Sequence, residues 1–140
     1  MRRLNELGKI KSEFENKLNL KIKIERNKVI IEGDPLDEYD ASRVFDAINF
    51  GFKVRKALIL KEENMVFKKI RIKSHTRRDL KDVKSRLIGK DGKTKRVISQ
   101  LGDCEIIIAE SEVGIIGYVE DVANVETAIV SIIKGTKQSN

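Results

Sequence analysis

An internal repeat with a constant offset of 84 residues is the feature that most limits the fold, because two copies of one pattern predict two copies of one supersecondary unit. Apolar positions fall on apolar positions, and a glycine falls on a glycine near each end of the aligned stretch. The aligned pairs are Gly8 and Gly92, Phe14 and Ile98, Leu20 and Cys104, Ile22 and Ile106, Ile24 and Ile108, Val29 and Val113, Ile31 and Ile115, and Gly33 and Gly117.

The second copy predicts three strands and three helices in the order β-α-α-β-β-α. Its first segment alternates apolar and basic residues, as in a half-buried strand. Apolar residues recur every three or four positions in the helical segments, and Gly102 stands where a helix C-cap is expected. The expected strands are Val66–Lys73, Cys104–Ala109 and Val113–Tyr118, and the expected helices are Lys81–Ile88, Lys93–Leu101 and Val119–Lys134.

The first copy is shorter. We expect a helix at Lys9–Leu18, strands at Leu20–Glu25 and Lys28–Gly33, and a helix at Asp37–Phe50 that Pro35 introduces. The offset aligns Met1 with Ser85, so an opening strand and most of a first helix have no counterpart. Either this unit is short, or the start codon lies upstream of Met1.

The fold class expected is α+β, with two packed units that each contain a small antiparallel sheet of three strands and helices on one face. The first unit is expected to be incomplete. The predicted domains are a truncated unit at 1–50, a helical linker at 51–65 with a short helix at Lys53–Leu60, an intact unit at 66–135 and a polar tail at 136–140.

Positive charge is concentrated in one stretch of the chain. The net charge is +7, and residues 66–96 contain thirteen basic and three acidic residues. Such an asymmetric block favours a phosphate-rich partner. From charge alone, the alternative is a solvated surface or a disordered basic arm. Aromatic residues make up 5% of the chain and Trp is absent, which excludes a surface built on aromatic stacking.

Inside the basic block, two glycines separated by Lys90 and Asp91 divide two predicted helices. Glycines allow a tight turn with no Cβ in the way, so a sugar-phosphate backbone can approach closely. The N-terminus of the following helix offers unpaired N–H groups and a partial positive charge. The next predicted strand can supply an apolar floor for bases, although Ile106 and Ile108 fit the core equally well.

A Gly-x-x-Gly loop by itself is a weak signal, because ordinary helix-turn-helix connections contain it by chance. Here four features coincide: the β-α-α-β-β-α order, basic residues on both sides of the loop, apolar residues before it, and the repeat. Residues 87–98, LIGKDGKTKRVI, resemble the signature of type I KH domains, and residues 115–122 resemble their last strand and the start of their final helix.

The whole chain resembles archaeal two-KH proteins related to Partner of Nob-one (Dim-two), a KH factor of small ribosomal subunit assembly. Residues 31–35, 51–52 and 56–58 carry this resemblance, together with the basic approach to Gly89. It implies binding of single-stranded RNA, specifically small-subunit rRNA near its 3′ end, with a maturation nuclease or a translation factor as a partner. The expected RNA-binding residues are Arg86, Ile88, Gly89, Lys90, Asp91, Gly92, Lys93, Lys95, Arg96, Ile106 and Ile108.

The first copy departs from this signature. Its loop position reads Asn5-Glu6-Leu7-Gly8, which lacks the first glycine and the lysine, and Glu6 would repel phosphate. We expect a degenerate KH unit that serves packing or protein partners. Two alternatives to rRNA binding stay open: an RNA-adaptor subunit of an exosome or translation complex, and a protein-interaction scaffold that uses this first unit.

Other chemistry finds little support. Cys104 is the only cysteine and His75 the only histidine of the sequence, so we expect no disulfide, zinc cluster or charge relay. We also expect no catalytic residues, no metal and no cofactor. Cys104 aligns with Leu20 and is expected to be a buried strand residue. No apolar run approaches the roughly 20 residues that span a bilayer, and the N-terminus lacks a signal-peptide pattern, which favours the cytoplasm without membrane contact.

Overall fold

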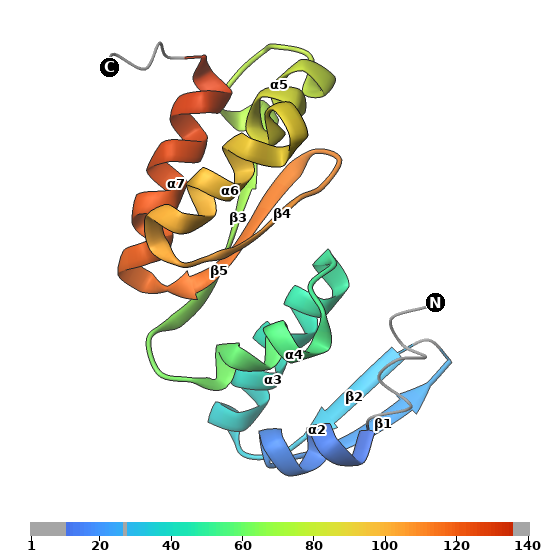
Figure 1. Cartoon of the computed structure of the whole chain (residues 1–140). Coiled ribbons are helices and arrows are strands. Elements are labelled where there is room, and N and C mark those ends of the chain that lie inside the picture. The colour runs from blue at the N-terminus through green and yellow to red at the C-terminus, as the bar shows by residue number, and fades with distance from the viewer. Residues whose placement is uncertain (1–10, 27, 136–140) are drawn as a thin grey trace. The chain divides into compact units, whose positions relative to one another are not determined.

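The computed structural model describes residues 11–26 and 28–135, which form helices and antiparallel strands of an α+β fold (Figure 1). The chain divides into two compact units, with the boundary between Glu62 and Glu63. No helix in the described ranges is long and apolar enough to cross a membrane.

The second unit contains a three-stranded antiparallel sheet with strand order β3-β5-β4. The predicted order β-α-α-β-β-α is confirmed. The elements are β3 (Met65–Arg71), the short 3-10 helix η2 (Ile72–Ser74), α5 (Leu80–Ile88), the 3-10 turn η3 (Lys90–Gly92), α6 (Lys93–Gly102), β4 (Glu105–Ile108), β5 (Glu112–Tyr118) and α7 (Val119–Lys134).

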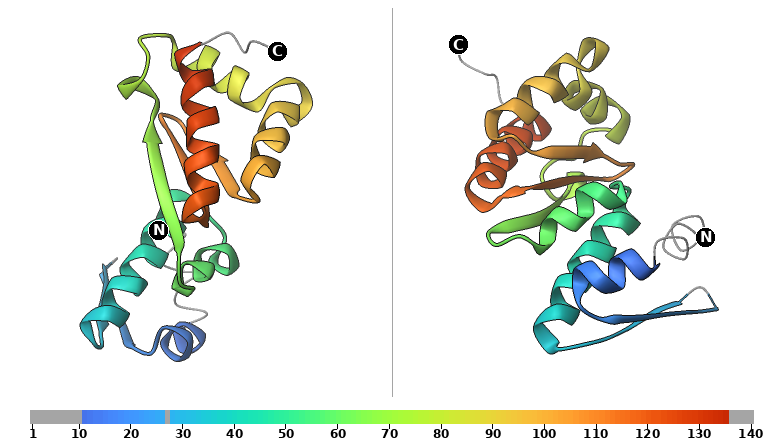
Figure 2. Two further views of the ribbon diagram at one scale, coloured as in Figure 1. Left: turned by 90° about the vertical axis from the view of Figure 1, so that its left-hand side faces the viewer. Right: turned by 60° about the horizontal axis from the view of Figure 1, so that its bottom comes forward.

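The strand register brings apolar side chains from all three strands together on one face of this sheet. Ile70 of β3 pairs with Val113 of β5, which pairs with Ile108 of β4, and Ile115 pairs with Ile106 in the adjacent row. The three helices α5, α6 and α7 cover that face (Figure 2). Each fully buried aliphatic side chain contributes about 1.5–3 kcal/mol of burial free energy, so this shared core holds helices and sheet together.

Gly102 has a different role from the predicted helix cap. It is the last residue of α6 and is buried, whereas Asp103 takes the left-handed cap conformation with φ 48°. A Cβ on Gly102 would lie 2.7 Å from the carbonyl oxygen of Asp121 and 2.9 Å from its Cβ. The glycine is therefore required for the close approach of α6 to α7.

The first unit contains a two-stranded antiparallel sheet and three α-helices within the described residues. Its elements are α2 (Lys11–Leu18), β1 (Lys21–Glu25), β2 (Lys28–Glu32), α3 (Pro35–Phe50), α4 (Val54–Ala57) and the 3-10 helix η1 (Leu58–Lys61). Pro35 occupies the first turn of α3 as predicted, and Gly51 ends the helix with φ 136°. The Asn5–Gly8 segment and the start of the predicted Lys9–Leu18 helix lie outside the described residues.

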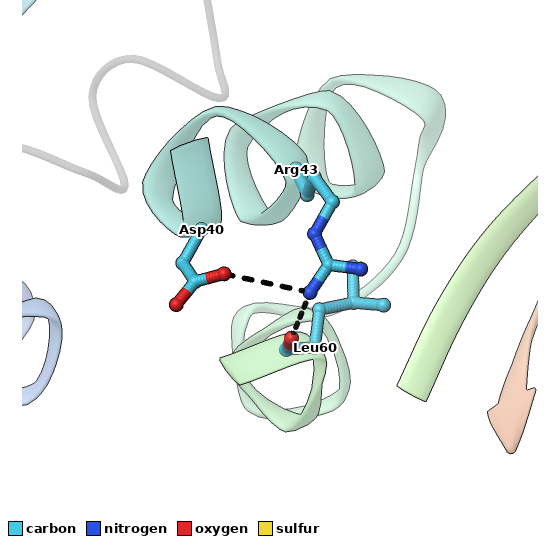
Figure 3. A network of polar contacts seen from close by, with 3 residues as sticks. All are labelled: Asp40, Arg43 and Leu60. Carbon is cyan, nitrogen blue, oxygen red and sulfur yellow. Dashed lines mark hydrogen bonds and ion pairs between the residues drawn. The ribbon is translucent and has the colours of Figure 1, made fainter. Parts of the chain in front are cut away.

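Arg43 connects α3 to the segment that follows it (Figure 3). Its Nη2 donates a hydrogen bond to the carbonyl oxygen of Leu60 and lies 3.7 Å from Oδ1 of Asp40. The guanidinium also lies 5.4 Å from the centroid of the Tyr39 ring. These contacts hold η1 against α3, where Leu60 is fully buried.

The elements of the two units are related by the interval that relates the sequence repeats. Pro35 and Val119 begin α3 and α7, and Phe50 and Lys134 end them, so both ends are 84 positions apart. The hairpins match equally well, because Lys21 and Glu105 begin β1 and β4. The order helix, strand, strand, helix is therefore common to both units.

Candidate nucleic-acid interface

The loop between α5 and α6 has an unusual backbone. Three of its residues have positive φ: Gly89 at 74°, Asp91 at 55° and Gly92 at 74°. The N–H of Gly89 donates to the carbonyl oxygen of Ser85 at 2.9 Å, and the N–H of Gly92 donates to that of Gly89 at 3.2 Å. A side chain at position 89 would also be sterically excluded, since its Cβ would lie 2.7 Å from Cβ of Thr94 and 2.8 Å from its nitrogen. The first glycine is thus required by conformation and by space.

A side chain of α6 fastens the tip of this loop. Nη1 of Arg96 donates a hydrogen bond of 2.7 Å to the carbonyl oxygen of Asp91, which is a non-glycine residue of this loop with a left-handed backbone conformation. A Cβ at Gly92 would lie 3.2 Å from the same Nη1. The bare Cα of Gly92 therefore leaves room for this contact.

A groove with a volume of about 620 Å³ opens beside the loop. The loop side supplies Ile88 and Gly92, helix α6 supplies polar and basic side chains, and strand β4 supplies an apolar wall. Its lining residues are Ile88, Gly92, Lys95, Arg96, Ser99, Gln100, Ile107 and Ile108.

The backbone of β4 offers further hydrogen-bonding groups at this groove. The N–H of Ala109 donates to the carbonyl oxygen of Glu112 at 2.8 Å, so these two residues form a hydrogen-bonded pair. Such pairs alternate with non-hydrogen-bonded pairs along antiparallel strands. The N–H and C=O groups of Ile106 and Ile108 are therefore directed away from β5. Because β4 is an edge strand, they face the open side of the sheet.

Basic side chains outnumber acidic ones around the groove and the loop. Lys90 and Lys93 are exposed beside the loop, Lys95 and Arg96 line the groove, and Arg86 is exposed on the last turn of α5. The first turn of α6 contains no acidic residue, so its partial positive charge is not neutralised locally. The basic side chains suit the charges of a flexible polyanion, and the apolar wall of the groove suits a flat apolar part of the same ligand.

Most residues predicted for the site lie together. Ile88, Gly92, Lys95, Arg96 and Ile108 line the groove. The remaining predicted residues of the loop and its flanks surround its mouth: Arg86, Gly89, Lys90, Asp91 and Lys93.

The side chain of Ile106 does not line the groove. It is 7% exposed and packs in the core, because the register directs it toward the helices. Its neighbour Ile107 lines the groove, as do Ser99 and Gln100 of α6. Helical spacing from Arg96 could have found Ser99 and Gln100, since positions i+3 and i+4 share a face. Ile107 requires the hairpin register, which the sequence pattern left open.

Cys104 is not part of this site. Its thiol is buried, and burial, followed by the negative charges of Asp121, Asp103 and Glu105, raises its pKa to about 11. The described part of the chain contains no cluster of His, Cys, Asp and Glu side chains that could hold a metal ion.

Comparison with known families decides the assignment of the second unit. Residues 65–140 match the family model for the second KH domain of Partner of Nob-one, described as a eukaryotic-type (type I) KH domain. The chain belongs to the type I KH family. The resemblance seen in residues 87–98 is thereby confirmed, and the groove lies beside the loop that carries the family signature.

Similar proteins come from archaea. A KH domain-containing protein of Methanocaldococcus jannaschii is 27% identical over 94% of this chain, which spans 62% of that relative's length. Crystal structures of Dim2p from Pyrococcus horikoshii, alone and in an a/eIF2alpha-aDim2p-rRNA complex, are both 27% identical to this chain. Each covers 94% of this chain, with TM-scores of 0.82 and 0.81, and the chain covers 82% and 77% of them. A protein of unknown function from Aeropyrum pernix is 29% identical over 93% of this chain and 74% of its own, with a TM-score of 0.83.

Proposed function

We propose that the chain binds single-stranded RNA in the groove between α6 and β4, with the Gly89–Gly92 loop holding phosphates. The observation that carries this proposal is the position of the groove. It lies between a loop whose positive-φ glycines let a sugar-phosphate backbone approach and a strand edge whose amides can contact base edges. Unstacked bases of single-stranded RNA expose those edges, whereas a duplex hides them.

The proposed RNA-binding residues make different contacts, according to whether they offer a charge, an apolar side chain or backbone groups. Lys90, Lys93, Lys95 and Arg86 neutralise phosphates, which supplies affinity without reading sequence. The apolar side chains of Ile88, Ile107 and Ile108 pack against base faces. Ile106 contributes through its backbone N–H and C=O groups at the edge of β4, with its side chain in the core.

The RNA we propose is small-subunit rRNA near its 3′ end, bound during ribosome assembly. The similar Dim2p is named in a complex with a/eIF2alpha and rRNA, which supports an rRNA ligand and a translation-factor partner. A maturation nuclease is a second partner class that this role implies. An adaptor role in an exosome or translation complex is the alternative, and co-purification of exosome subunits in place of pre-ribosomal particles would favour it.

For the first unit we propose a degenerate KH unit at 1–50, joined by a linker at 51–65 to the KH domain at 66–135. The common order of elements and the interval of 84 residues support a shared origin. The sequence Asn5-Glu6-Leu7-Gly8 lacks the features that hold phosphate. This unit would then serve packing or a protein partner, and partner binding that survives charge reversal at Lys90 would support a scaffold role.

The loop assignment is tested by Lys90→Asp. We expect RNA affinity to fall by at least about tenfold, because a cation beside phosphate is replaced by an anion. Lys61→Asp in the first unit is the matched control, since it changes an exposed lysine by the same charge. Fluorescence anisotropy measures binding, and circular dichroism verifies folding. A folded Lys90→Asp variant with unchanged affinity would refute the assignment of the loop.

The identity of the RNA is tested with an oligonucleotide from the 3′ end of the host's small-subunit rRNA, compared with a scrambled oligonucleotide at two salt concentrations. Preference for the authentic sequence would support the role in ribosome assembly. Equal and strongly salt-dependent binding to both would favour a general KH adaptor whose specificity comes from partners.

A further inference from the structure

The thirteen basic residues of 66–96 have different environments. Nζ of Lys68 lies 3.9 Å from Oε2 of Glu126, and Nζ of Lys73 donates to the carbonyl oxygen of Arg78 at 2.7 Å. The guanidinium of Arg78 lies where a Cβ on Gly135 would be, next to the C-terminal end of α7. These three side chains therefore take part in the fold of the KH domain itself.

Two lysines of α5 have no such role. Lys81 is exposed and Lys84 is half-buried, and neither side chain makes a hydrogen bond or ion pair with any described residue. Val83 and Leu87 mark the face of α5 that packs into the core. Lys81, Lys84 and Ile88 are spaced by three and four residues, so they form one stripe along the helix. Ile88, at the end of this stripe, lines the groove.

From this stripe we infer an extension of the RNA-binding surface: Lys81 and Lys84 contact phosphates of nucleotides that lie outside the groove. The inference rests on the proposed function, since it continues the path of the same RNA. Seven residues of helix span about 10 Å, so the stripe reaches well beyond the loop. A lysine ammonium group is a compact charge at the end of a flexible side chain. It can therefore pair with phosphates of a flexible RNA strand in several geometries.

The ligand of this extension is the ribose-phosphate backbone of single-stranded RNA, which the two lysines bind through its negative charge. Each phosphate neutralised on a single strand adds about 0.7 to the slope of log K against log salt concentration. Two additional phosphate contacts therefore predict that the slope for RNA long enough to reach both lysines exceeds the slope for RNA confined to the groove by about 1.4.

The test compares random-sequence RNA of four and of ten nucleotides on the intact chain and on a Lys81→Gln, Lys84→Gln variant. We expect the variant to bind the longer RNA about tenfold more weakly, with a salt slope lower by about 1.4, and the shorter RNA within about twofold of the original affinity. Lys21→Gln with Lys23→Gln is the matched control, because it removes two exposed lysines from the first unit.

Three outcomes are informative. Equal weakening for both lengths would overturn the inference, because it would place the two lysines inside the groove site. Unchanged binding of the longer RNA would overturn it as well. Lys90→Asp is measured alongside: if it weakens neither RNA, the proposed loop function fails, whereas a length-dependent loss in the Lys81 and Lys84 variant would still support the stripe.

Discussion

Arg96 is the residue whose role changes most once its contacts are known. Its charge and its place after the loop predict a phosphate contact, but its Nη1 is engaged by the carbonyl oxygen of Asp91. A left-handed backbone at a residue other than glycine costs on the order of 1 kcal/mol, and it persists only where surrounding contacts favour it. We therefore interpret Arg96 as a positioning residue that holds the loop in its binding conformation.

Arg96→Ala is expected to weaken RNA binding about tenfold, because the loop then has to be ordered by the RNA. Asp91→Gly removes the conformational cost, so Arg96→Ala should cost about threefold or less in that background. The salt slope separates positioning from a direct phosphate contact: positioning leaves it unchanged, and a contact lowers it by about 0.7. Additive losses in the double variant would contradict the positioning role.

The buried thiol of Cys104 makes a prediction about pH. Its pKa is raised from 9.0 to about 11 in the folded protein, chiefly by burial. The folded state therefore favours the neutral thiol, and this contribution to stability is complete below pH 9 and is lost as the pH rises through 11. Urea unfolding at pH 8 and pH 10.5 should show a larger loss for the original chain than for Cys104→Ala. Parallel losses would contradict the burial effect.

At the level of elements, the contact between α6 and α7 depends on one position. Ala has a better helix propensity than Gly by roughly 1 kcal/mol, so Gly102→Ala would stabilise an isolated helix. Here the added Cβ would meet Asp121 of α7 at 2.7 Å and 2.9 Å, and we expect a net destabilisation of about 1–3 kcal/mol. Thermal unfolding measures this. Asn124→Ala, at an exposed position of α7, is the control and should be neutral or slightly stabilising.

Helix α7 and Gly102 show which features the sequence pattern predicts and which it does not. The bounds of α7 were predicted correctly at Val119–Lys134, because its apolar positions recur at helical spacing and tertiary contacts reinforce that pattern. Gly102 was misread because a glycine at a helix end fits both a cap and a close packing contact, and only the second helix distinguishes them. Ile106, Ile107 and Ile108 are chemically identical, so the direction of each depended on the hairpin register.

On the scale of the whole molecule, the buried cluster beneath the helices of the KH domain is built from the domain's own residues. Every member of the cluster that includes Ile70, Val113 and Ile133 lies between residues 66 and 133, after the unit boundary at Glu63. The basic block of 66–96 lies in the same unit. If the first unit makes no RNA contact, folding and RNA binding should both reside in residues 63–140.

We therefore expect a fragment of residues 63–140 to fold cooperatively and to bind a single-stranded oligonucleotide within about threefold of the affinity of the intact chain. Circular dichroism and thermal unfolding test the first point, and fluorescence anisotropy tests the second. The fragment carrying Lys90→Asp is the control, and it should lose affinity as the intact variant does. A folded fragment with a loss of more than about tenfold would show that residues 1–62 contact RNA, contrary to the degenerate role proposed for the first unit.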